Sequence, residues 1–190
     1  SKVIDAKGRT VTPGFNDSHY HLGMGSYTLD ELYLDNVKTL TELKDAVQRY
    51  ARENPDKSWI VGRRCSYDID GAKPLTRQHL DAIEANKPVA LYSLDFHTVW
   101  VNTKALEVGN ILHGAETQAG SEIVMASDGT GSGELREPAA YHLVTDKRPE
   151  RSKSEKLALI KQGIQLANSY GITSIHNMDD EDGELDKYDV

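Results

Sequence analysis

Two histidines two residues apart, His19 and His21, stand at the end of a segment with the pattern of a β-strand. Because side chains in a strand alternate between its faces, both imidazoles are expected on one face, together with Asp17. The dipeptide Pro13-Gly14 marks the entry to this strand. A strand that ends in paired imidazoles and leads into a helix is typical of a strand–helix barrel, so the segment favours an α/β fold with a metal site at the strand end.

The His-x-His motif has an ordinary structural alternative. Seven histidines occur in the 190 residues, and short motifs of this kind arise by chance. Two half-exposed histidines at a strand end explain the motif as well as a metal site does, so the surrounding sequence has to separate the two interpretations.

Four blocks of sequence resemble those of one known family, in the family's order. The segment VIDAKGRTVTPGFNDSHYHL, residues 3–22, is similar to the entry of the amidohydrolase superfamily, in which a β-sandwich strand leads into barrel strand one and its D-x-H-x-H. Residues 95–106 resemble the D-x-H-x-x-W-x-N-[ST]-x-A-L block of the amidohydrolase-3 branch. Residues 133–139 and 171–176 resemble its G-x-L-x-E-x-A and G-[IV]-T-[ST]-[VI]-[HN] blocks. The chain is therefore identified as a member of that branch.

The resemblance implies a metal-dependent hydrolase of carbon–nitrogen bonds other than peptide bonds, with a small-molecule substrate. The expected cofactor is a divalent metal, preferably zinc, because neutral imidazole is a good zinc ligand and bound water has its pKa lowered to about 7. His19 and His21 are the expected metal ligands. Asp17 is expected to orient a ligand rather than bind the metal. Glu137 is a candidate bridging ligand, although a solvated acid at a helix start explains it too.

Three further residues are predicted to lie near the substrate by the same resemblance: His97, Trp100 and His176. An ordinary buried His-Trp pair explains the first two equally well. His176 ends a predicted strand on the catalytic face of a barrel, but a lone histidine is more often structural. The acidic stretch 179–186 is interpreted as a solvated loop.

Helix and strand signals divide the chain into four parts. Capping boxes at Thr39-x-x-Glu42 and Ser152-x-x-Glu155 open two clear helices, and a strand over 172–176 is expected to pair beside the two histidines. Between them, strands at 59–62 and 89–94 and short helices capped by Thr76 and Asn102 are spaced less regularly than barrel repeats of about 30 residues. We therefore expect partial (β/α) TIM-barrel elements with an inserted α+β lobe. The predicted parts are the end of an amino-terminal β-sandwich (1–10), the first barrel strand and helix (11–56), the lobe (57–150), and a barrel helix with the second barrel strand (151–190).

A complete barrel needs roughly 250 residues, so the sequence is interpreted as the amino-terminal part of a longer enzyme. By family resemblance, the remaining ligands and the general base would lie beyond residue 190. The isolated part is then expected to be inactive, and its open strand edges favour a homo-oligomer. The alternative is a non-catalytic domain that binds a ligand or partner through the inserted lobe.

Composition excludes several classes of partner. A net charge of −8 and a pI near 5.3 disfavour nucleic acid. No apolar run approaches the roughly 20 residues that cross a bilayer, so no membrane partner is expected. A single cysteine, Cys65, fits a reducing compartment, and the predicted location is cytoplasmic.

Overall fold

The computed structural model describes residues 3–71 and 74–179, and the chain divides into two compact α/β units. One unit, the histidine unit, comprises Ser1–Asp30 and Arg151–Val190. The other, the lobe, comprises Glu31–Glu150.

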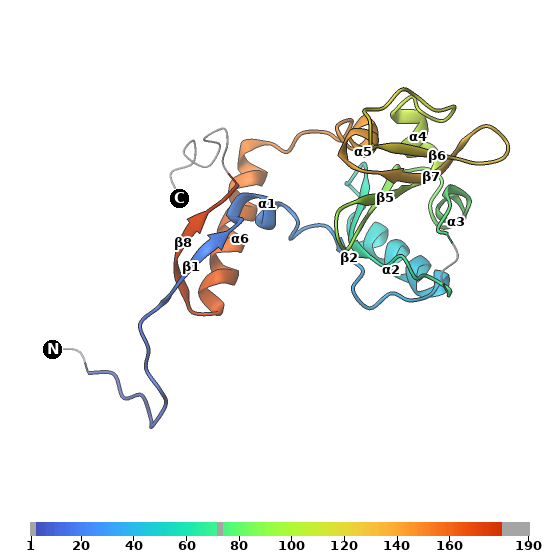
Figure 1. The fold of residues 1–190 in the computed structure, drawn as a ribbon. Coiled ribbons are helices and arrows are strands. Elements are labelled where there is room, and N and C mark those ends of the chain that lie inside the picture. The colour runs from blue at the N-terminus through green and yellow to red at the C-terminus, as the bar shows by residue number, and fades with distance from the viewer. Residues whose placement is uncertain (1–2, 72–73, 180–190) are drawn as a thin grey trace. The chain divides into compact units, whose positions relative to one another are not determined.

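The histidine unit contains a two-stranded parallel sheet of β1 (Phe15–Tyr20) and β8 (Ile172–Asn177). Asp17 lies opposite Ile175, and Tyr20 lies opposite Asn177 after a register shift. Figure 1 shows these strands, blue and red, side by side with the helices α1 (Leu22–Tyr27) and α6 (Lys153–Ser169). Two segments from opposite ends of the sequence thus form one sheet, whose carboxyl ends lie together.

Glycines allow the helices and strands of this unit to pack closely. A Cβ at Gly163 of α6 would collide with the Ser26 side chain of α1, so only glycine allows the two helices to come this near. A Cβ at Gly14 would likewise collide with Thr173 on the neighbouring strand. α6 begins with the predicted capping box, in which Ser152 and Glu155 bond each other's backbone.

Residues 3–12 form no strand, and the end of a β-sandwich expected over 1–10 stays a prediction. The chain does turn at Lys7–Gly8, where Arg9 N donates to Ala6 O at 2.9 Å. The apolar side chains of Val3, Ile4 and Val11 are 79–88% exposed. These residues have the sequence pattern of a strand but form none, because no strand of the described chain pairs with them.

The lobe is built on a six-stranded mixed sheet of order β2-β3-β4-β5-β7-β6. β2, β3 and β4 are parallel, and the pairs β4-β5, β5-β7 and β7-β6 are antiparallel. The strands are β2 (Leu32–Tyr33), β3 (Ile60–Cys65), β4 (Val89–Ser93), β5 (Thr98–Val101), β6 (Glu122–Met125) and β7 (Gly131–Arg136).

Side chains of the lobe's central strands point alternately to the two faces of the sheet and pack into two separate hydrophobic cores. Ile60, Leu91 and Trp100 pack with apolar residues of α2 (Leu40–Glu53) and α3 (Arg77–Ile83). Val61, Ala90 and Val99 pack with those of α4 (Thr103–Val108) and α5 (Pro138–Thr145). The sheet is therefore covered by helices on both faces, as expected for strands that are apolar throughout.

The division of the chain differs from the predicted one. The helix predicted to follow the first barrel strand, now α2, buries Leu43, Ala46 and Val47 in the core of the lobe. The compact lobe therefore begins at Glu31, whereas the predicted lobe begins at residue 57. The helix that does follow β1 is α1, whose six residues include two glycines and are too few to show helical periodicity.

Candidate functional site

His19 and His21 meet at the end of β1. Their ring centres are 5.2 Å apart and their ring planes are inclined at 69°. His19 is the fifth residue of β1, and His21 is the N-cap residue of α1. Both are exposed. The two imidazoles thus lie together where the strand turns into the helix.

Asp179, just beyond β8, bonds both His21 and the start of α1. Its Oδ1 lies 2.7 Å from His21 Nδ1, and its Oδ2 accepts from Met24 N at 3.0 Å. Asp179 is 9% exposed at the side chain, whereas His21 is 42% exposed. The stretch interpreted as a solvated loop therefore begins with a largely buried carboxylate, which corrects that interpretation at this residue. Residues 180–186 lie outside the described part of the chain.

Asp17 contacts a candidate ligand through the backbone. Its Oδ1 accepts a hydrogen bond from His19 N at 3.0 Å, which fixes the strand just before the histidines. The carboxylate that bonds the His21 imidazole is instead that of Asp179, 158 residues away in sequence. The sequence did hold one indication of this contact. Asp179 closely follows a strand that was predicted to lie beside β1, so the two strand ends were expected to be close.

The donor chemistry fits part of a metal site. Two imidazoles that bind one tetrahedral zinc have ring centres about 5 Å apart if each Zn–N bond is about 2.0–2.1 Å. The observed 5.2 Å separation of His19 and His21 matches that requirement. Among the described residues, no group of three or more His, Cys, Asp or Glu side chains could hold a metal ion. The described chain thus supplies two fitting donors.

His176 belongs to the same unit, near the carboxyl end of β8, and is exposed. Within the described residues, no hydrogen bond of its side chain is observed. The structure therefore places it at the sheet end that carries His19 and His21, without a contact that defines its role.

The remaining candidates, His97, Trp100 and Glu137, lie in the lobe around the β4-β5 turn. His97 Nδ1 lies 3.1 Å from both carboxylate oxygens of Glu137, and Glu137 N donates to His97 O at 2.8 Å. The hydrogen bond to Glu137, with the attraction of its charge, raises the pKa of His97 above its ordinary value. The structure thus pairs the candidate bridging carboxylate with an imidazole of the lobe.

Two residues at this pair, Glu137 itself and Phe96 just before His97, have strained backbones. Phe96 has φ 63° and Glu137 has φ 65°, in a region that non-glycine residues rarely adopt. Phe96 is 50% exposed. Backbone strain of this kind clusters at functional sites, and here it lies directly beside the His97–Glu137 pair.

Trp100 is only 3% exposed and packs in the core beneath the turn. Its ring meets the Tyr67 ring edge-on at 5.0 Å, and Tyr67 Oη donates toward Asp95 Oδ1 or Thr98 Oγ1, each 3.0 Å away. Trp100 thus packs behind Tyr67, whose side chain is 49% exposed, and its place near the substrate stays a prediction.

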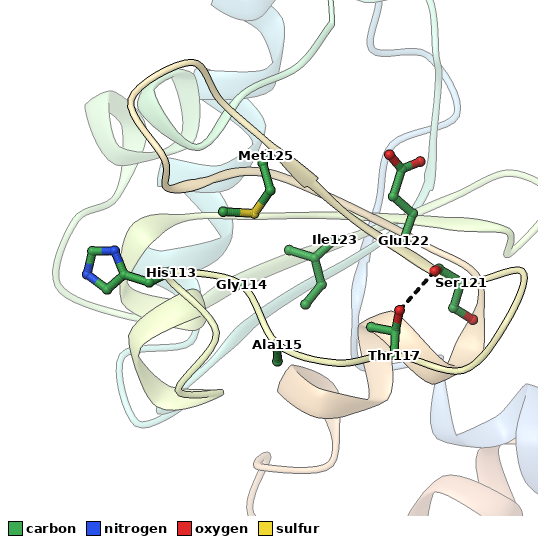
Figure 2. A pocket seen from close by; sticks show the side chains of 8 residues that line it. All are labelled: His113, Gly114, Ala115, Thr117, Ser121, Glu122, Ile123 and Met125. Carbon is green, nitrogen blue, oxygen red and sulfur yellow. Dashed lines mark hydrogen bonds between the residues drawn. The ribbon is translucent and has the colours of Figure 1, made fainter.

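The lobe also carries an open cavity of about 520 Å³ between the 111–121 segment and β6 (Figure 2). Figure 2 shows Met125 and Ile123 over the segment, with His113 pointing away from them. Thr117 Oγ1 donates to Ser121 O, and Glu122 pairs with Arg136. None of the predicted site residues lines this cavity.

Among the described residues, no helix has both the length and the apolar character needed to cross a membrane.

The chain is similar to known proteins over most of its length. The model of the amidohydrolase family matches residues 2–190. Protein LONG AFTER FAR-RED 3 of Arabidopsis thaliana is 30% identical over 90% of the chain, and N-substituted formamide deformylase of Arthrobacter pascens is 32% identical over 74%. The chain spans 29% and 26% of the lengths of these two relatives.

A solved structure shares the fold. The crystal structure of an uncharacterized metal-dependent hydrolase from Pyrococcus horikoshii OT3 is 25% identical, with a TM-score of 0.61. The match covers 87% of this chain and 31% of that protein.

Proposed function

The chain belongs to the amidohydrolase family, and from that premise we propose that it supplies part of the metal site of a hydrolase acting on carbon–nitrogen bonds other than peptide bonds. The observation that carries the proposal is the 5.2 Å separation of the His19 and His21 rings at one strand end. Support for the reaction class comes from the relative that is an N-substituted formamide deformylase. Support for a divalent metal comes from the metal-dependent hydrolase of similar fold.

In this proposal each residue has a defined task. His19 and His21 hold the metal, and Asp17 fixes the backbone of His19 through its 3.0 Å hydrogen bond. A bound divalent metal, preferably zinc, lowers the pKa of a coordinated water and so supplies a nucleophile at neutral pH. Glu137 is a candidate further ligand.

The substrate groups are proposed from position. His97 is exposed, and its Nδ1 faces Glu137, so its other ring nitrogen, Nε2, can donate to a carbonyl oxygen of a small molecule when the imidazole is protonated, the form that Glu137 favours. His176 is exposed near the carboxyl end of β8, at the sheet end that carries the two histidines. We also propose that β1 and β8 are neighbouring strands of a (β/α) barrel. The hydrolytic activity is proposed for the whole protein.

Metal analysis of the full chain tests the proposal. We expect bound zinc in the wild type and at least about a tenfold loss of zinc affinity in His19→Ala and His21→Ala, because each removes one imidazole ligand. His142→Ala is the matched control, since His142 is also exposed and bonds a carboxylate, that of Asp146 at the C-cap of α5. Equal zinc binding by all four proteins would refute the site and favour a non-catalytic binding domain.

A further inference from the structure

We propose that Asp179 is a positioning residue for His21, which it holds in the tautomer that carries its proton on Nδ1 and leaves Nε2 to bind metal. The inference rests on the proposed function and deepens it. It starts from one contact, the 2.7 Å approach of Asp179 Oδ1 to His21 Nδ1.

The contact determines where the imidazole proton lies. An ionised carboxylate has only acceptors, so the nitrogen that faces it must donate. In a neutral imidazole the other nitrogen, Nε2, then keeps its lone pair. A metal ligand whose second ring nitrogen donates to a carboxylate is fixed in orientation and is made a stronger base.

The carboxylate itself is held in place by the backbone. Its second oxygen, Oδ2, accepts from Met24 N in the first turn of α1. Only 9% of the Asp179 side chain is exposed, so little of this contact is open to competing water. Because both oxygens are engaged, rotation of the carboxylate away from His21 would break two hydrogen bonds at once.

Neighbouring bonds lock the end of β8 onto the junction of β1 and α1. Met178 N donates to Tyr20 O at 2.7 Å, and Asn177 Oδ1 accepts from Leu22 N at 2.9 Å. Asn177 and Asp179 therefore both satisfy open N–H groups at the start of α1. Only Asp179 also bonds a histidine, and this difference provides a matched control.

The Asp179→Asn variant separates positioning from helix capping. The amide oxygen replaces one carboxylate oxygen as the acceptor for Met24 N, so its NH₂ group faces His21 Nδ1. Nδ1 must then accept, and the proton moves to Nε2, the nitrogen proposed to bind metal. We expect the capping bond to survive while the tautomer reverses.

Two measurements on the full chain test this. Imidazole ¹⁵N NMR of the metal-free protein should show Nδ1–H for His21 in the wild type and Nε2–H in Asp179→Asn. Zinc affinity, measured by competition with a chelator, should fall about 10–100-fold in Asp179→Asn. Asn177→Ala removes a cap of the same helix without touching His21, so it should lower the melting temperature but keep the wild-type tautomer and zinc affinity.

Three results would overturn the inference: a wild-type His21 protonated on Nε2, an Asp179→Asn chain with wild-type tautomer and affinity, or an Asn177→Ala chain that loses zinc as strongly. A wild type that shows Nδ1–H and reverses in Asp179→Asn but binds no zinc would refute the proposed function. In that case Asp179 would still set the tautomer, so the two failures are distinguishable.

Discussion

Ser93 Oγ donates a 2.7 Å hydrogen bond to Asp95 Oδ1 at the turn between β4 and β5. Tyr67 Oη and His97 N also lie within hydrogen-bond distance of the same oxygen, at 3.0 and 3.2 Å. These donors, with Ser93 first, hold the pKa of Asp95 below its ordinary value. The turn that presents His97 is thus organised around one ionised carboxylate.

The lowered pKa predicts how this turn responds to acid. A carboxyl group whose pKa is lower when folded stabilises the fold above its unfolded pKa of about 3.9, and the contribution disappears as pH falls through the lowered value. Ser93→Ala should raise the pKa of Asp95, as measured by ¹³C NMR of the carboxyl carbon. Ser169→Ala, whose hydroxyl bonds only Leu166 O, is the control. An unchanged Asp95 pKa in Ser93→Ala would contradict the assignment of Ser93 as the main cause.

Asn102→Ala should destabilise the lobe by about 3 kcal/mol or more, because each buried polar group left without a partner costs about 1–3 kcal/mol. Asn102 is fully buried, and its Oδ1 accepts from Val89 N and Ala105 N. Its Nδ2 donates to Glu84 O and Lys87 O. Urea denaturation measures the change. Asn86→Ala, at an exposed position, should shift stability by no more than about 0.5 kcal/mol.

Glu31→Ala should cost about 3–5 kcal/mol, because it leaves two partly buried guanidinium groups without their anion. The Glu31 side chain is 2% exposed and pairs with both Arg63 and Arg148. Glu31 is the first residue of the lobe and Arg148 lies near its end, so removing Glu31 also breaks an ion pair that links the two ends of the lobe. The control is Asp35→Ala. Its pair with Arg64 is over 40% exposed on both sides and is worth about 0–1 kcal/mol. Equal losses in the two variants, measured by urea denaturation, would contradict the proposed importance of burial.

The 190-residue chain by itself should show no zinc-dependent turnover on N-acyl and cyclic amide substrates. Water activation needs a complete ligand set and a positioned base, and the described residues bring together two imidazoles. An extended chain that covers the length of the relatives should be active. Zinc-dependent turnover by residues 1–190, abolished by His19→Ala, would show that the catalytic groups are already present.

The sequence by itself was sufficient for features set by near neighbours. The capping boxes of α2 and α6 form as predicted, and Asn102 caps α4, because these bonds join residues three apart. The rings of His19 and His21 also lie together, although His21 stands one residue beyond β1 as the N-cap of α1, so strand alternation alone does not set their placement. Family membership could also be inferred from the sequence, because short blocks of matching residues in the same order identify a family without knowledge of the fold.

Apart from the pairing of β1 with β8, which the sequence predicted, only the tertiary structure decided which distant segments meet. It assigned α2 to the lobe, buried Trp100 under Tyr67 and brought Asp179 to His21. The sequence around each of these residues shows polarity and periodicity, but not which of several apolar faces or strand ends will be its partner. That choice depends on how the whole chain packs, because burial and long-range pairing are satisfied jointly across the fold rather than residue by residue.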